Sequence, residues 1–452
     1  MNSHHDFVVL GGGLAGLTFA LEASRAGRQV AVLEKEDQVG GLARTMRYGD
    51  YRFDLGGHRF HSRWPHITRW FLDIMDGDAL AVSRHSRIRL GDRYVDYPLR
   101  FPDALTAFSP AKMAEVLASY LKAAILRRHR RPDVSFEDWI VQRFGRSLFE
   151  VYFKPYTEKV WGFACSDLSA DWAAERVRLP SLRAAIAGSM TRRAPAPSTL
   201  VSKFYYPPLG IGVLPERIAA LACQTGRATV LISSSAVHAR RQAGGGWRVT
   251  YRGPKGEADI EGRVLVSTMP LDSLIGILPL SVQEANPLAT RLPFRSLICV
   301  FLAVEGPRIS EDTWTYFPDR QLFIGRTHEP ANWSSKMVPE GKTSLCVEVF
   351  CSEGDDAWCQ PDAEVIDRVL ADLERLQFLP RSRVIQAWMT RVDHAYPTYH
   401  VGYEADLSRA VAVVGRFSDL HLLGRSGTFR YLNLDAVIRE GITLARSLCQ
   451  GP

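Results

Sequence analysis

The chain has 452 residues, of which 46% are hydrophobic and 23% are charged, a composition typical of globular proteins rather than disordered or fibrous ones. A chain of this length exceeds one ordinary core, so we expect two or three substructures. The formal net charge of +7 suits anionic ligands, but no recognition motif accompanies the basic runs, and we do not expect nucleic-acid binding. The seven cysteines are scattered and form no CxxC pattern, which predicts a reduced protein. We see no apolar run of membrane length and no signal peptide, and we therefore expect a cytoplasmic protein.

The first fifty residues contain a glycine-rich turn that follows a short apolar strand. Residues 7–10 are all apolar and predict the buried strand, and residues 17–26 predict the helix after the turn. Residues 29–33 predict a second strand. This order of strand, helix and strand indicates the dinucleotide-binding unit of a Rossmann-type fold.

Gly11, Gly13 and Gly16 occupy the three glycine positions of that unit. They allow a tight turn, a close approach of the backbone to a pyrophosphate, and close packing of the helix on the strand. Glu34 ends the second strand, where an acid binds a ribose hydroxyl. A second glycine turn at Gly40 favours FAD over NAD. The residues predicted to hold FAD in this segment are Gly11, Gly13, Leu14, Ala15, Gly16, Glu34, Lys35, Gly41, Leu42 and Ala43.

The remaining pattern predicts an α/β fold class in which three separated segments form the FAD domain. Helical spacing dominates residues 111–126 and 136–153, whereas apolar runs over 297–304, 322–326 and 344–350 predict an antiparallel sheet. We therefore expect a GR2-like, Rossmann-type FAD domain, a helical insertion and an antiparallel-sheet substrate domain. The expected boundaries are 1–65, 205–275 and 404–452 for the FAD domain, 66–204 for the mainly helical substrate or lid domain, and 276–403 for the sheet domain.

Three features of these segments have alternative interpretations. The basic amphipathic stretch near Tyr120 could rest on a membrane surface, but we expect a core-packed helix with a solvated basic face and no membrane contact. Residues 192–198 are rich in Arg and Pro and predict an exposed, mobile loop that could close over a site. His58 and His61 are spaced loosely like metal ligands, but no third ligand is evident, and we expect no metal.

Two further blocks resemble the amine oxidase and protoporphyrinogen oxidase-like FAD flavoproteins. Residues 53–62, Phe-Asp-Leu-Gly-Gly-His-Arg-Phe-His-Ser, resemble the stretch that brings backbone against the isoalloxazine ring. Residues 424–435 resemble the C-terminal FAD motif, in which Arg425 would meet the diphosphate and a helix near Asp435 would point its N-terminus at the flavin. The resemblance adds these FAD-binding residues: Gly56, Gly57, His58, Val237, Gly424, Arg425, Asn433, Leu434 and Asp435.

Within that superfamily the chain is similar to UDP-galactopyranose mutase and its relatives, and the similar blocks occur in the same order. The most specific block is Tyr-Thr-x-Lys-x-Trp-Gly at residues 156–162. The other similar blocks are residues 94–98, 172–177, 314–318, Arg326, 332–334 and 395–398.

This resemblance implies a flavin-dependent nucleotide-sugar pyranose/furanose mutase. In such enzymes N5 of reduced FAD is the nucleophile at the anomeric carbon, and no net redox change occurs. NAD(P)H could serve as the external reductant. His58, Arg176 and Arg326 would be catalytic, with His58 beside the flavin and the two arginines gripping the substrate diphosphate. The implied substrate-binding residues are Tyr97, Thr157, Trp161 (as the floor of the sugar pocket), Arg176, Tyr316, Arg326, Tyr396 and Tyr431.

Two other functions remain open at this stage. The FAD domain fits a redox enzyme equally well: an oxidase, dehydrogenase or desaturase of an amine, porphyrin, polyprenyl or sugar substrate. The deciding features are whether Arg176 and Arg326 line the pocket and whether the pocket is polar or apolar. A non-catalytic flavoprotein kept for partner binding is the third alternative. A homo-oligomer is plausible, and any of the named arginines and tyrosines could instead be structural.

Overall fold

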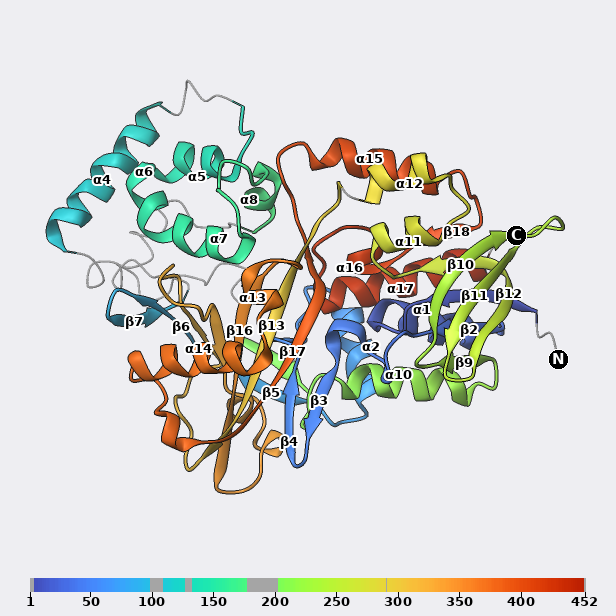
Figure 1. The fold of residues 1–452 in the computed structure, drawn as a ribbon, viewed down its shortest axis with the longest axis horizontal. Coiled ribbons are helices and arrows are strands. Elements are labelled where there is room, and N and C mark those ends of the chain that lie inside the picture. The colour runs from blue at the N-terminus through green and yellow to red at the C-terminus, as the bar shows by residue number, and fades with distance from the viewer. Residues whose placement is uncertain (1–3, 98–108, 127–131, 177–201, 290, 451–452) are drawn as a thin grey trace.

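The computed structural model describes residues 4–97, 109–126, 132–176, 202–289 and 291–450. Two seven-stranded sheets form the body of the molecule, and a group of helices lies beside the second sheet (Figure 1). The N- and C-terminal segments both lie at the end of the molecule that holds the first sheet.

The first sheet has a parallel centre and an antiparallel edge. Its strand order is β10-β11-β12-β1-β2-β9, and β18 pairs with β12. All pairs are parallel except β10–β11 and β11–β12. The strands are β1 (His5–Leu10), β2 (Val30–Leu33), β9 (Ala228–Leu231), β10 (Ser235–Arg241), β11 (Trp247–Gly253), β12 (Gly256–Ser267) and β18 (Leu420–Leu422).

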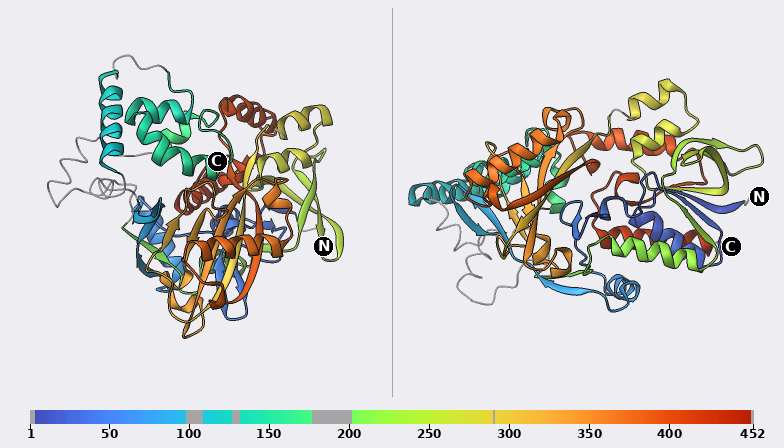
Figure 2. Two further views of the ribbon diagram at one scale, coloured as in Figure 1. Left: turned by 60° about the vertical axis from the view of Figure 1, so that its left-hand side comes forward. Right: turned by 60° about the horizontal axis from the view of Figure 1, so that its bottom comes forward.

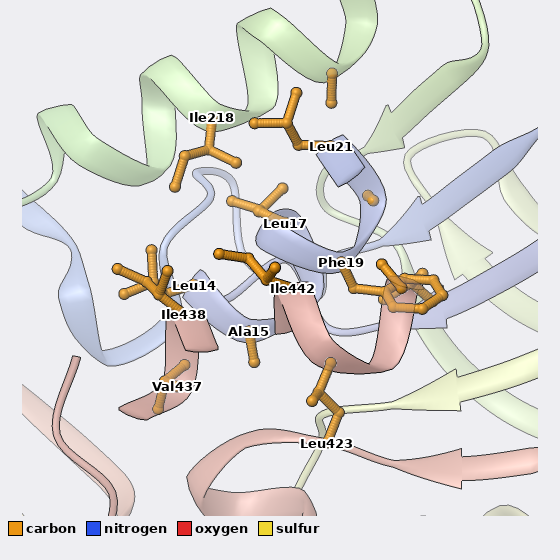
Figure 3. Close-up of a cluster of buried hydrophobic side chains, with 14 of the residues drawn as sticks. Leu14, Ala15, Leu17, Phe19, Leu21, Ile218, Leu423, Val437, Ile438 and Ile442 are labelled. Carbon is orange, nitrogen blue, oxygen red and sulfur yellow. The ribbon is translucent and has the colours of Figure 1, made fainter. Parts of the chain in front are cut away.

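Three helices from distant parts of the chain pack together against this sheet (Figure 2). They are α1 (Leu14–Arg25), α10 (Val213–Gln224) and α17 (Leu434–Cys449). Figure 3 shows Leu17, Ile218 and Ile442 pointing toward one another from these helices, and all three are buried. This shared core joins the two ends and the middle of the chain into one structural unit.

The second sheet is antiparallel except for one pair. Its order is β17-β13-β16-β15-β14-β6-β7, and only β14 and β6 run parallel. The strands are β6 (Ser86–Leu90), β7 (Arg93–Asp96), β13 (Phe294–Glu305), β14 (Trp314–Tyr316), β15 (Arg326–His328), β16 (Lys342–Cys351) and β17 (Val384–Pro397).

Strand β13 is buried on both faces, which explains its continuous apolar sequence. On one face Val300 belongs to a core with Val365 and Val369 of α14 (Asp362–Arg375), which covers that side. On the other face Phe301 stacks on Phe53 at 4.9 Å. Phe53 comes from a hairpin of β3 (Thr45–Tyr48) and β4 (Tyr51–Asp54). The two sheets are therefore joined through this hairpin.

The remaining elements connect or cover the sheets. A two-stranded pair is formed by β5 (Leu80–Ser83) and β8 (Lys203–Tyr206). The other helices are α2 (Pro65–Met75), α4 (Pro110–Ile125), α5 (Phe136–Phe144), α6 (Arg146–Leu148), the π-helical turn η3 (Phe149–Phe153), α7 (Lys154–Trp161), α8 (Ala170–Arg176), α11 (Leu271–Ile277), α12 (Val282–Ala289), α13 (Asp356–Cys359), α15 (Tyr403–Val414) and α16 (Gly424–Gly427). Short 3-10 turns are η1 (Gly41–Ala43), η4 (Pro330–Asn332), η5 (Ser335–Met337) and η6 (Arg381–Arg383).

The predicted α/β fold class is confirmed, with one parallel and one antiparallel sheet system, but several elements differ from expectation. The helical pattern over 136–153 breaks at Gly145, whose φ of +85° ends α5. Residues 322–325 have no regular secondary structure, and strand β15 begins only at Arg326. The region expected to be mainly helical also supplies β6 and β7 to the second sheet.

Helix α4 is less buried than the sequence pattern predicts. Only Val116 is buried, whereas Leu121 and Ile125 are exposed, because α4 lies at the edge of the helical group. Within the described ranges, no helix is both long and apolar enough to cross a membrane. The predicted loop at 192–198 lies outside the described residues.

Candidate active site

The two glycine turns of the first fifty residues meet backbone to backbone. The N–H of Gly40 donates to the carbonyl of Gly12 at 2.8 Å. A Cβ added to Gly41 would lie 3.3 Å from the Cα of Gly13. Gly13 also precedes α1 and gives it no side-chain cap, so the first N–H groups of the helix are free to bind a ligand. The result is a cradle of backbone that suits a diphosphate.

Two fingerprint glycines are required by close backbone approaches. Gly11 has φ +105°, and a Cβ there would lie 2.3 Å from the Oγ1 of Thr268. A Cβ on Gly16 would lie 2.2 Å from the carbonyl oxygen of Gly11. No side chain fits either position, so the turn can form only with glycine.

Glu34 sits at the end of β2 and closes the same turn. Its carboxylate accepts hydrogen bonds from the N–H of Gly12 at 2.7 Å and of Glu36 at 2.9 Å. Burial raises the pKa of Glu34, although these two N–H donors work in the opposite direction. Glu34 therefore fixes the loop in addition to its predicted contact with a ribose.

A cavity of about 1220 Å³ runs from this cradle toward the second sheet. That volume exceeds the usual range of a small-ligand pocket and leaves room for a dinucleotide and a further ligand. The predicted cofactor residues that line it are Gly11, Gly13, Leu14, Ala15, Glu34, Lys35, Gly41, Leu42, Ala43, Gly56, Gly57, His58, Gly424, Arg425, Asn433, Leu434 and Asp435. Gly16 packs behind the turn, and Val237 lies in β10 beside the lining residue Ala236.

A second helix N-terminus faces the cavity. Asn433 precedes α17 without capping it through its side chain, and Leu434 and Asp435 of the first turn also line the cavity. Two uncapped helix N-termini on one cavity, together with the glycine cradle, fit a diphosphate and an electron-accepting ring. The residues present therefore fit an FAD.

The stretch predicted to face the flavin is held against the second sheet. A Cβ added to Gly57 would lie 2.2 Å from the Nε1 of Trp314, so the backbone packs directly on the indole. His58 follows, and its Nδ1 is buried with no hydrogen-bond partner in the described part of the chain. Burial, and then the charges of Arg425 and Arg326, lower the pKa of His58 to about 3. His58 is therefore a neutral imidazole at neutral pH.

Arg326 forms a buried ion pair beside this stretch. Its Nε donates to the Oε1 of Glu348 at 2.8 Å, and its Nη2 donates to the Oε2 of the same carboxylate. Nη2 also lies 3.5 Å from the hydroxyl of Tyr396. Burial acts to lower the pKa of Arg326, but the Glu348 carboxylate holds it well above its usual value. Arg326 is therefore permanently charged, with its own counter-charge beside it.

Two tyrosines stack at the same end of the cavity. The rings of Tyr396 and Tyr431 lie 5.7 Å apart with an interplanar angle of 6°. Arg425 supports the pair: Nε and Nη2 donate to the carbonyl of Leu432, Nη1 donates to the carbonyl of Ala395, and the guanidinium lies 4.4 Å from the Tyr431 ring. Arg425 thus fixes the segments that carry both tyrosines.

The predicted substrate residues divide into two groups. Tyr316, Arg326, Tyr396 and Tyr431 line the cavity. Tyr97 and Trp161 stand behind that wall: Tyr97 packs on Tyr316 at 4.5 Å, and Trp161 packs 6.4 Å from Tyr396. Trp161 thus lies next to a lining residue but not in the lining itself. Thr157 lies on α7 outside the cavity lining. Arg176 ends α8, and its side chain lies outside the described part of the chain.

Several residues of this site were not predicted as site residues. Arg59 and Trp314 line the cavity, and both lie in blocks used for the family resemblance. Glu348 is a lone acid in the apolar strand β16, a pattern that could have signalled a buried partner for an arginine. Asp54, which directly precedes the stretch predicted to face the flavin, accepts hydrogen bonds from Tyr206 and Thr45.

An ionic cluster stands at the cavity wall near Lys35. The Nε2 of His394 lies 3.0 Å from Asp272, and its Nδ1 lies 3.3 Å from Asp393. Burial acts to lower the pKa of His394, but the neighbouring carboxylates of Asp272 and Asp393 raise it to about 9. His394 therefore ties the end of β17 to α11 as a cation. No group of three metal-binding side chains occurs in the ranges that the structure describes.

The fold and cavity define an FAD-binding flavoprotein. Residues 14–449 match the model of the family described as flavin containing amine oxidoreductase. The match covers almost the whole chain, so the protein belongs to that family and its cofactor is FAD.

Similar proteins with known names have more than one activity. The match to probable flavin-containing monoamine oxidase A of Dictyostelium discoideum is 44% identical but spans 57 residues, 13% of this chain and 12% of that protein. Chloroplastic protoporphyrinogen oxidase of Nicotiana tabacum is 23% identical, over 90% of this chain and 79% of that protein. The crystal structure of reduced UDP-galactopyranose mutase has a TM-score of 0.83 and 22% identity, over 99% of this chain and 96% of that one. This last likeness is one of fold.

Proposed function

We propose that the protein is a flavin-dependent mutase that interconverts the pyranose and furanose forms of a nucleotide sugar, with no net redox change. The observation that carries the proposal is the polar wall beside the flavin-facing stretch. Arg326 and the hydroxyl-bearing Tyr316, Tyr396 and Tyr431 line the cavity there. An apolar polyprenyl substrate has no use for such a wall, whereas a sugar diphosphate needs its donors.

Bound FAD, in its reduced form, would supply the nucleophile for this isomerisation. The chain's own residues bind and orient the substrate. Arg326 donates to the diphosphate and stabilises the charge that develops on it as the sugar departs. Tyr396 and Tyr431 offer hydroxyl groups from a rigid stack, and the neutral imidazole of His58 adds no charge of its own to this part of the cavity. Arg176 is proposed as a second diphosphate ligand on the basis of the resemblance.

A flavin-dependent oxidoreductase is the second candidate, because it is the activity named for the family and for the tobacco relative. The two candidates differ in what happens to the flavin. An oxidoreductase changes the flavin redox state once in every half-reaction, whereas a mutase returns it unchanged.

The test uses purified holoprotein under anaerobic conditions. The flavin is reduced with dithionite, and UDP-galactose and a panel of other nucleotide sugars are added and separated by chromatography with mass detection. A product of unchanged mass that forms only with reduced flavin supports the mutase. Bleaching of the oxidised flavin by amines, porphyrinogens or polyprenyl compounds, without any isomer, supports the oxidoreductase instead.

A further inference from the structure

Arg59 is a half-buried cation that has no role in the substrate contacts proposed above. Its guanidinium lies 4.7 Å from the ring of Trp314 and 5.6 Å from that of Phe204, and the residue lines the cavity. Its Nη1 is buried without a hydrogen-bond partner in the described ranges. An aromatic face attracts a guanidinium but accepts no hydrogen bond from the N–H groups that lie in the guanidinium plane. The planar fork of N–H groups of Arg59 therefore stays available for a ligand.

No carboxylate pairs with Arg59 among the residues that the structure describes. Burial, and then the neighbouring charge of Arg84, lower the pKa of Arg59 to about 10, which leaves it charged at neutral pH. Leaving a buried charge unpaired is costly, and proteins usually retain one where a ligand compensates it.

Arg326 differs from Arg59 in this respect. The Glu348 carboxylate, whose side chain is fully buried, already neutralises Arg326. Arg326 can donate a hydrogen bond to an anion but brings no net positive charge with it. A diphosphate carries at least two negative charges, so the attraction must come from a cation without its own counter-charge.

The neighbours of Arg59 place it at the substrate end of the cavity. The groups that influence its charge include Tyr316, Arg326 and Tyr431, all of them predicted substrate residues. Trp314, on which it stacks, packs against Gly57 in the stretch predicted to face the flavin. The glycine cradle for the cofactor diphosphate is built from other elements, α1 and η1.

We propose that Arg59 recognises the anionic group of the substrate, a nucleoside diphosphate, and supplies the net charge that Arg326 lacks. This inference rests on the proposed function for the identity of the ligand. It assigns the two guanidiniums different tasks: Arg59 attracts and grips the diphosphate through charge, and Arg326 orients it. Trp314 holds the Arg59 fork in place before the ligand arrives.

The test measures binding of UDP, uridine and inorganic pyrophosphate to the FAD-loaded full chain by calorimetry. Variants are Arg59→Gln, which removes the charge, and Arg59→Lys, which keeps the charge but loses the fork. Arg252→Gln is the matched control, because Arg252 pairs with Glu257 on the exposed surface of β11. Flavin content and melting temperature establish that each variant is folded.

We expect Arg59→Gln to raise the Kd for UDP on the order of 10- to 100-fold, the usual effect of losing a charge-assisted hydrogen bond in a buried site. Uridine affinity should not change, the control should match wild type, and Arg59→Lys should fall between. The UDP affinity of wild type should also decrease with ionic strength more steeply than that of Arg59→Gln. If Arg59→Gln does not fold, the weaker UDP binding of Arg59→Lys, which keeps the charge but loses the planar guanidinium, tests the same contact.

The outcomes separate this inference from the proposed function. Equal UDP affinity in wild type and both Arg59 variants overturns the role of Arg59 and leaves the mutase proposal intact. If wild type binds pyrophosphate but no nucleoside diphosphate, and Arg59→Gln no longer binds pyrophosphate, the anion site is supported. The same result contradicts a nucleotide-sugar substrate. Absence of anion binding in wild type overturns both.

Discussion

Arg326 and Glu348 face each other across the neighbouring strands β15 and β16, and their side chains form a bidentate ion pair. Glu348 is fully buried, whereas the Arg326 side chain remains 18% exposed toward the cavity. The pair therefore fixes the direction of the guanidinium: Nε and Nη2 donate to Glu348, and Nη2 also lies 3.5 Å from the hydroxyl of Tyr396, which lines the cavity. A site residue is thus held by the rigid part of the fold.

Removing the charge of Glu348 should destabilise the protein strongly. Glu348→Gln keeps the side-chain volume but leaves Arg326 without its counter-charge, and we expect the free energy of unfolding to fall by about 3–5 kcal/mol. Urea unfolding measures it. Glu257→Gln, in the exposed pair with Arg252, should cost less than about 1 kcal/mol. Equal losses in the two variants would contradict the account of the buried pair.

Adding one methyl group at Gly57 should release the flavin. The new Cβ of Gly57→Ala would overlap the indole of Trp314, and such overpacking costs about 1–3 kcal/mol. We expect a lower ratio of flavin to protein after purification and a lower melting temperature. Gly276→Ala is the matched control, because its Cβ would meet nothing within 4 Å and alanine favours the helix α11. Full flavin content in Gly57→Ala would show that this contact is not needed.

The His394 cluster should make stability depend on pH above neutrality. The pKa of His394 is raised to about 9 in the folded protein, so its stabilisation is complete below the unfolded pKa of 6.5 and is lost as pH rises through 9. The side chain is 20% exposed, and we expect a loss on the order of 2–3 kcal/mol across this window. His394→Asn tolerates the positive φ at this position and should remove this pH dependence. Denaturant unfolding of wild type and variant at pH 6 and pH 9.5 measures the effect. If the free energy of unfolding changes between these pH values as much in the variant as in wild type, His394 is not the cause of the pH dependence.

Substitution of Arg425 separates a structural role from a charge role. Arg425→Lys keeps the positive charge, but a single ammonium cannot bridge the carbonyls of Leu432 and Ala395 as the guanidinium does. If bridging is the main role, the variant should lose flavin on dilution and raise the KM for substrate several-fold. Wild-type behaviour would indicate that Arg425 acts through its charge, as the predicted contact with the FAD diphosphate implies. Flavin fluorescence after dilution measures the first effect.

Local sequence was sufficient to predict the glycine cradle. The positions of Gly11 and Gly16 follow from backbone requirements that only glycine meets, so their spacing predicts the cradle without knowledge of the rest of the fold. The apolar strand β13 was predictable for a similar reason, since burial on both faces demands a continuous apolar run.

The substrate half depends on contacts between distant segments. Strand β17 has no clean alternation, because most of its residues are only partly buried, and β7 carries charged residues at an edge. The pairing of Arg326 with Glu348 arises from strand register that no local pattern encodes. Motif resemblance located Trp161 near the site but could not show that Tyr396 stands nearer the cavity.

The central claim is isomerisation without net redox change, and one ratio tests it directly. The holoprotein is reduced anaerobically and mixed with an excess of the nucleotide sugar that it binds, and the isomer formed and the flavin oxidised are measured in the same sample. If the protein is a mutase, each flavin should form many molecules of isomer of unchanged mass while the absorbance of the reduced flavin stays constant. The oxidised protein should form no isomer. Oxidation or reduction of one flavin for each substrate converted, with a product that differs by two hydrogens, would contradict this claim and identify an oxidoreductase.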